Sequence, residues 1–155
     1  MLFSCDNEGK DNFRFVFIDF ENNVEKRFIL KKVLQNKDSI IYKRAFLQSL
    51  KEDSVIVHLL DDGVVYDDID FKFEGPSKYK ILFNSQDTID VYRVVKDINI
   101  DSKMYNHVYI YEVHYSELGY NDVYNIRYYF DRKSSLLIKG EIYTPSRIVS
   151  VFKVE

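Results

Sequence analysis

The chain has 155 residues, a length that suits one domain with a sizeable core, and 46% of them are apolar, which excludes disorder as the main state. Its 22 basic and 25 acidic residues give a formal net charge of -3, so no basic excess is available for nucleic acid or an anionic membrane surface. The single cysteine excludes an internal disulfide and a cysteine-based metal site, and no run approaches the roughly 18 apolar residues of a membrane-spanning helix.

Aromatic side chains make up 16% of the chain, with 13 Tyr, 12 Phe and no Trp. Rings and β-branched side chains pack well on a pleated, half-buried surface, so this composition favours strands. Only five Gly and two Pro are present, and the turns must therefore be made largely by Asn, Asp and Ser.

The first residues, Leu2-Phe3-Ser4-Cys5, resemble the lipobox of bacterial lipoproteins. Leu2 lies three residues before the cysteine and the small Ser4 directly before it, as in that family, whereas Phe3 stands where a small or aliphatic residue is commoner. The resemblance implies that Cys5 is a lipid anchor and that residues 1–11 form a flexible tether behind it. The membrane would then be contacted through this anchor only.

Two cellular locations are possible, because no signal peptide with a basic and an apolar region precedes Leu2 in this sequence. If translation starts upstream of Met1, we expect a lipid-anchored protein of the bacterial cell envelope. If Met1 is the true start, we expect a cytoplasmic protein.

From residue 12 onward the chain reads as strands with short polar breaks, and we expect a single β-rich domain over 12–155. Segments 13–20 and 24–34 predict the first hairpin. A later hairpin is predicted around Asp62-Gly63, because Asp-Gly supplies the positive φ of a tight turn. The strands predicted after the first hairpin are 54–60, 64–73, 78–84, 89–97, 105–116, 123–131, 136–144 and 147–154.

Residues 39–51 show a different spacing. Their apolar residues Ile41, Tyr42, Ala45, Phe46 and Leu50 recur at intervals of three and four, which predicts a short helix, with a strand over 39–47 as the alternative. About ten strands with hairpin breaks favour an all-β fold, an antiparallel sandwich or a full or half barrel, with at most this one helix.

The segments 105–116, 123–131 and 136–144 predict their own strand register. Pairing the first two antiparallel places Tyr111 opposite Tyr128 and Tyr109 opposite Phe130. Aromatic and β-branched pairs of this kind stabilise a sheet by about 0.2–1 kcal/mol each. We therefore expect Tyr109, Tyr111, Tyr128 and Phe130 to form a core face or the wall of a ligand cavity.

The return strand should place Ile138 opposite Phe130, Ile142 opposite Ile126 and Gly140 under the ring of Tyr128. A slip by one residue would send each side chain to the wrong face, so the register should be strongly specified.

On the opposite face this register forms a structural charge ladder of Glu112, Arg127 and Glu141. Arg127 should lower the pKa of Glu112. His114, on the same face as Glu112, is expected beside it on a polar, wet surface. The alternative is an acid/base pair of Glu112 and His114 in a hydrolase.

Signatures of catalysis and of cofactor binding are missing from the sequence: it contains no nucleophile elbow, zinc-protease motif, phosphate-binding loop or dinucleotide fingerprint. The acidic run 61–70 lacks the spacing of a calcium loop. We expect no catalytic site, no metal and no cofactor.

The functional expectation is an envelope lipoprotein with a non-catalytic binding or structural role, using an aromatic-lined cleft for a protein or small-molecule ligand. One alternative is a small acidic inhibitor or immunity-type protein, because charge complementarity speeds association with a basic partner. Its acidic residues would be Asp61, Asp62, Asp67, Asp68 and Asp70.

The lipobox resemblance makes a prediction about Cys5. Expressed from an upstream start with a signal peptide, the protein should incorporate a labelled fatty acid, and Cys5→Ser should abolish the label because the acceptor thiol is lost. Gel autoradiography measures both. A label that survives the substitution contradicts the anchor.

Overall fold

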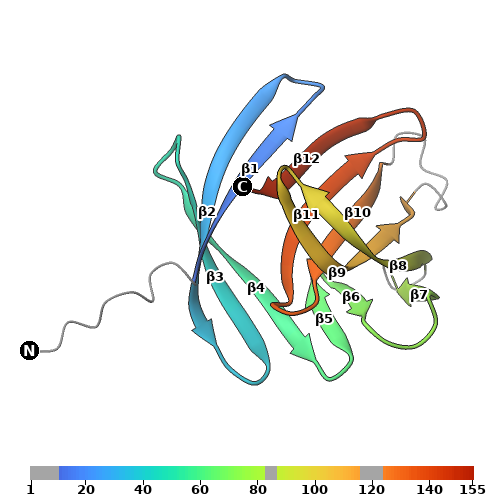
Figure 1. The fold of residues 1–155 in the computed structure, drawn as a ribbon. Helices are drawn as coiled ribbons and strands as arrows, with labels where there is room; N and C mark the ends of the chain where they lie inside the picture. Colours follow the sequence, from blue (N-terminus) through green and yellow to red (C-terminus); the bar gives the residue numbers. More distant parts are fainter. Residues whose placement is uncertain (1–10, 83–86, 116–123) are drawn as a thin grey trace, which may run out of the picture.

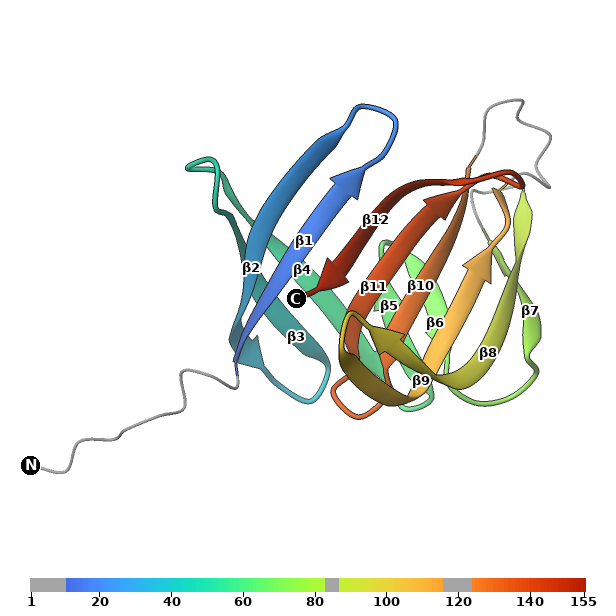
Figure 2. The same cartoon turned by 45° about the horizontal axis from the view of Figure 1, so that its top comes forward.

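The computed structural model describes residues 11–82, 87–115 and 124–155, and these form one antiparallel sheet curled into a nearly closed barrel (Figures 1 and 2). Each strand pairs with the strand that follows it in the sequence, except that β6 does not pair with β7, and β1 also pairs with β12. The strands are β1 (Asn12–Asp19), β2 (Val24–Gln35), β3 (Ser39–Phe46), β4 (Glu52–Leu60), β5 (Gly63–Tyr66), β6 (Ile69–Lys72), β7 (Lys78–Leu82), β8 (Thr88–Ile100), β9 (Lys103–Val113), β10 (Asn125–Asp131), β11 (Leu136–Tyr143) and β12 (Ile148–Val154).

The predicted all-β antiparallel fold is confirmed, and of its alternatives the barrel is the one that forms. The described residues form twelve strands rather than about ten, partly because the segment 64–73 is split in two. Asp67 and Asp68 have φ values of 51° and 60° and turn the chain there, so that β5 and β6 form a hairpin. Asn and Asp adopt this left-handed conformation more readily than other side chains.

The helix predicted within residues 39–51 is wrong, since the described part of the chain contains no α-helix and this segment forms β3. Ile40 and Tyr42 point inward and are each 3% exposed, whereas Lys43 points to solvent. β3 pairs along its length with β2 and with β4, so hydrogen bonding on both edges overrides the helical spacing.

The predicted register of β9, β10 and β11 is present over most of its length. Tyr111 pairs with Tyr128, and Tyr109 pairs with Phe130. A bulge between Tyr129 and Phe130 shifts the end of β10 by one residue, so Phe130 faces Leu137 instead of Ile138.

Two glycines have roles that differ from those predicted. Gly140 does face Tyr128, but the ring that closes over it belongs to Phe152 of β12: a Cβ at Gly140 would lie 2.2 Å from the Cε1 of Phe152. Gly63 is not in a positive-φ conformation. Its hairpin needs glycine because a Cβ there would lie 2.1 Å from the backbone oxygen of Phe71.

Phe71 of β6, whose side chain is fully buried, has three aromatic neighbours in the core. Its ring centroid lies 5.0 Å from that of Tyr111, 4.8 Å from that of Tyr128 and 5.0 Å from that of Phe130. These distances and the tilted geometry are the favourable ones for aromatic pairs. β6 is therefore packed against β9 and β10 across the interior of the barrel.

Strands β6 and β7 end the sheet and do not pair with each other, and side chains bridge the seam between them. The hydroxyl of Tyr79 donates to the carbonyl of Asp70 at 2.9 Å and accepts from the amide of Lys72 at 3.0 Å. The hydroxyl of Tyr111 and the Nη1 of Arg93 both donate to the carbonyl of Lys72, at 2.7 and 2.8 Å. Three backbone groups of β6, the carbonyls of Asp70 and Lys72 and the amide of Lys72, thus have partners at the seam without a neighbouring strand.

Tyr111 joins the aromatic core to this seam. Two substitutions separate the contribution of its buried ring to stability from that of its hydroxyl. Tyr111→Ala should lower the free energy of unfolding by about 3–5 kcal/mol, because it empties a buried ring site. Tyr111→Phe should cost only about 1 kcal/mol, since it removes one hydrogen bond to Lys72. Urea denaturation measures both, and equal losses would contradict this division.

Candidate functional site

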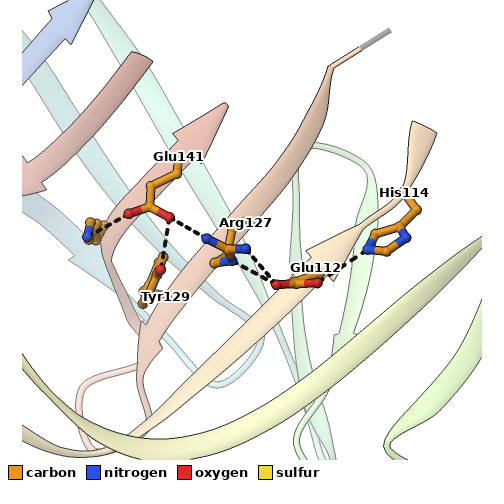
Figure 3. A network of polar contacts seen from close by, with 6 residues as sticks. Glu112, His114, Arg127, Tyr129 and Glu141 are labelled. Carbon is orange, nitrogen blue, oxygen red and sulfur yellow. Dashed lines mark hydrogen bonds and ion pairs between the residues drawn. The ribbon is translucent and has the colours of Figure 1, made fainter. Parts of the chain in front are cut away.

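The charge ladder lies on the outer face of β9, β10 and β11, and Arg127 is its centre (Figure 3). The Nε of Arg127 donates to Oε1 of Glu112 at 2.9 Å, and its Nη1 donates to Oε2 of Glu141 at 2.9 Å. Glu141 is only 4% exposed. It also accepts from the hydroxyl of Tyr129 at 2.9 Å and lies 2.7 Å from the Nζ of Lys139.

The pKa values of both glutamates are lowered. Burial by itself raises the pKa of Glu112, but hydrogen bonds from Arg127 and His114 and the positive charge of Arg127 more than offset it. Burial also raises the pKa of Glu141, and Lys139, Tyr129 and Arg127 together reverse the shift. Both carboxylates are therefore held as anions by fixed partners and are not poised to take up a proton near neutral pH.

His114 is less exposed than the sequence suggests. Its Nε2 lies 3.3 Å from Oε2 of Glu112, and its ring packs against that of Tyr92 with the centroids 4.7 Å apart. The side chain is 26% exposed, so the predicted wet surface is in fact half-buried. Glu112 contacts His114 and Arg127 together, an arrangement that suits a structural network better than acid/base catalysis.

The five aspartates of the acidic-surface alternative lie on or beside β5 and β6. Asp61 and Asp62 precede β5 and Asp67 and Asp68 follow it, so the two pairs are separated by a four-residue strand, roughly 13 Å long. Asp70 is only partly exposed, and its Oδ1 is buried without a hydrogen-bond partner among the described residues. Burial raises the pKa of Asp70.

Clusters of three or more His, Cys, Asp or Glu side chains that could hold a metal ion are not found among the residues that the structure describes. The described residues also include no helix that is long and apolar enough to cross a membrane. Cys5, the predicted lipid anchor, lies outside the described residues, as do most of the residues assigned to the tether.

The four aromatic residues predicted as a core face or cavity wall belong to the core. Tyr111, Tyr128 and Phe130 are buried around Phe71, and the ring of Tyr109 packs against Phe73 with the centroids 5.2 Å apart. None of the four lines the apolar cavity that the structure contains.

This cavity lies in the other half of the barrel and has a volume of about 350 Å³. The strands that enclose it are mainly β1 to β4; β1 to β3 lie on the left of Figure 2, whereas β8 to β10 lie on the right. Most of the side chains that line it are apolar, and many of these are aromatic. The apolar lining residues are Phe15, Phe17, Phe28, Leu30, Phe46, Val55, Val57, Leu136, Leu137 and Phe152.

The cavity has a closed end and a mouth. Phe15, Leu30 and Val57 are buried, whereas Phe17 and Phe46 are only half-buried and Lys26 is exposed. We call the part lined by Phe17, Lys26, Arg44 and Phe46 the mouth.

Polar groups are few in the cavity. Arg44 donates from its Nε to Oδ1 of Asp53 at 2.7 Å, and its guanidinium lies over the rings of Phe28 and Phe46. Burial raises the pKa of Tyr42 and of Tyr66 to about 12. Neither of these hydroxyls has a hydrogen-bond partner in the described part of the chain.

Sequence reasoning missed this cavity, although a signal for it was present. Phe13, Phe15 and Phe17 alternate along β1 and mark one inward face. On β2 and β3 the same face carries Lys26 and Arg44, which a filled core would exclude. Charged side chains at inward positions of aromatic strands were therefore the clue.

Comparison of the chain with protein-family models, with curated proteins and with solved structures finds no match. The assignment of a function therefore depends on the geometry of the cavity and of the charge ladder.

The charge ladder predicts a pH-dependent stability. Arg127→Ala should lower the free energy of unfolding at pH 7 by about 2–4 kcal/mol, because it leaves the buried Glu141 without one of its cations. The pKa values of Glu112 and Glu141 are lower in the folded than in the unfolded protein, so their ionised forms stabilise the fold at any pH above the unfolded-state pKa values. This stabilisation is lost as the pH falls through the folded-state pKa values.

The difference between wild type and Arg127→Ala should therefore be largest near neutral pH and shrink towards pH 3, as followed by urea denaturation. Lys43→Ala is the control, because Lys43 and Glu52 form an exposed pair, each about half accessible. It should cost less than about 1 kcal/mol. A constant difference between Arg127→Ala and wild type across this pH range would contradict the role of the carboxylates.

Proposed function

We propose that this protein is a non-catalytic binding module that holds a small, largely apolar molecule in the cavity between β1 to β4 and β11. The observation that carries the proposal is the cavity itself, about 350 Å³ in volume and lined mainly by apolar side chains. Protein interiors are close-packed and contain few voids larger than a water molecule. Small-molecule sites span roughly 300–1,000 Å³, and this volume falls at the lower end of that range.

The cavity wall supports the proposal because its shape is held by contacts within the protein. Phe15 and Phe28 stack with their ring centroids 5.1 Å apart and their planes at 2°. Arg44 is fixed against Phe28 and Phe46 by its ion pair with Asp53. A wall that is already ordered adds little entropic cost on binding, which favours affinity.

The titratable charge ladder lies away from the cavity, which is consistent with a binding role for the cavity. The ladder of Glu112, Arg127 and Glu141 lies on the outer face of the sheet, whereas the cavity opens inside the barrel. Tyr42 and Tyr66 are the uncharged polar side chains of the lining that could orient a ligand by hydrogen bonds, and their raised pKa values keep them neutral.

The cellular location of the protein is a second part of the proposal. The lipobox resemblance of Leu2, Ser4 and Cys5 supports attachment of the binding domain to the bacterial cell envelope through lipid on Cys5. One acyl chain binds membranes only marginally, and the several chains that the resemblance implies would provide a stable anchor.

Filling the cavity should abolish binding. We expect N-phenyl-1-naphthylamine, a neutral apolar fluorophore, to bind the wild type saturably with a rise in fluorescence. Val55→Trp places an indole in the cavity and should weaken this binding at least tenfold. The matched control is Ile56→Trp, because Ile56 is the next residue on β4 and is 47% exposed on the outer face.

Thermal melting shows whether each variant is folded, since overpacking costs about 1–3 kcal/mol. If Val55→Trp fails to fold, Val55→Phe provides a smaller obstruction. Binding of the fluorophore should also raise the melting temperature of the wild type. Unsaturable fluorescence, or equal binding by the two tryptophan variants, would refute the proposal.

A further inference from the structure

Lys26 is placed unusually for a surface lysine. It lies on the inward face of β2, opposite Phe17 and two residues before Phe28, at the mouth of the apolar cavity. Its neighbours Glu25 and Arg27 point outward and pair with each other at 2.5 Å. The ammonium of Lys26 has no carboxylate within 4.0 Å among the described residues.

The other cation of the mouth is already paired. Arg44 holds Asp53 through its Nε and Nη2, and Asp67 also acts on it electrostatically. Asp53 lies on β4 and Asp67 follows β5, whereas Lys26 lies on β2. Because adjacent strands are roughly 4.8 Å apart, β3 keeps these carboxylates on the far side of the mouth from Lys26. Lys26 therefore places a positive charge at the edge of an apolar cavity, with no carboxylate within 4.0 Å of its ammonium among the described residues.

A lysine in such a place can bury its aliphatic stem against the rings and keep its ammonium at the rim. A ligand that fills the cavity and ends in a negative charge would bring that charge to the ammonium. A charge-assisted hydrogen bond of this kind is stronger than one between neutral groups. A single cation matches a single negative charge.

We propose, building on the binding function above, that the ligand is an amphipathic monocarboxylate of fatty-acid type. Its hydrocarbon chain fills the cavity and its carboxylate pairs with Lys26. Phe17 and Phe46 contact the part of the chain next to the carboxylate, and Phe15 and Val57 line the closed end that receives its tip.

The test compares dodecanoate with dodecan-1-ol, which has the same chain and no charge. Each competes with N-phenyl-1-naphthylamine, dodecanoate below the concentration at which it forms micelles and dodecan-1-ol below its solubility limit. Lys26→Met keeps an apolar stem and removes the charge. It should weaken dodecanoate binding about tenfold, as loss of one partly exposed ionic contact predicts, and leave dodecan-1-ol binding within twofold.

Two further variants sharpen the test. Lys26→Arg should retain dodecanoate binding, because it restores the cation at the same position. Lys31→Met removes a charge from the outer face of the same strand, where Lys31 is exposed and pairs with Lys43 in register. It should change neither affinity, which controls for the net charge of the protein.

The outcomes separate this inference from the proposed function. If the fluorophore binds and both compounds displace it, but Lys26→Met weakens them equally or not at all, the carboxylate assignment is wrong and the binding function stands. If dodecan-1-ol binds and dodecanoate does not, the assignment is also wrong. If neither the fluorophore nor either compound binds the folded wild type, both proposals fall.

Discussion

The seam between β6 and β7 is the constraint on which the barrel depends. The two strands end the sheet, and hydrogen bonds from Tyr79, Tyr111 and Arg93 replace the backbone ladder that would otherwise join them. Arg93 also donates to the carbonyls of Glu74 and Gly75, so it orders the connection between the two strands. An unsatisfied strand edge is open to pairing with another chain, and these side chains remove that hazard.

Closure of the seam divides the interior into two unlike halves. With β6 held in place, Phe71 fills the space between β6, β9 and β10, and that half is packed. The half enclosed by β1 to β4 has no strand equivalent to β6 lying across it, and it keeps the cavity. The outer ladder around Arg127 reinforces the packed half, where β9, β10 and β11 must stay in register for Tyr111 to reach Lys72.

Sequence patterns predicted the strands and the register well because each strand carries its own alternation. Arg127 could be placed beside Glu112 and Glu141 from the order of residues alone. The register that pairs charges of opposite sign on one face of β9, β10 and β11 also pairs aromatic rings on the other face. The same reasoning failed where tertiary contacts decide. The bulge after Tyr129, the strand conformation of residues 39–46 and the close approach at Gly63 all depend on neighbours that local spacing does not reveal.

The position of the cavity was harder to predict for a related reason, because it depends on which strands face one another across the interior. Aromatic rows on β1 and on β10 look alike in the sequence. One row packs against Phe71 and the other lines open space, and the position of β6 distinguishes them in the structure. The inward placement of Lys26 became meaningful once its strand was known to border that space.

The order of the strands has a consequence for how this chain reaches its fold. All pairings but one join strands that follow each other directly, so each hairpin can form from contacts close in sequence. The exception, β1 with β12, joins Phe15 to Val154 and closes a loop of nearly the whole described chain. Loop-closure entropy makes such a contact late and slow. We therefore propose that the hairpins form first and that the pairing of β1 with β12 is the rate-limiting step of folding.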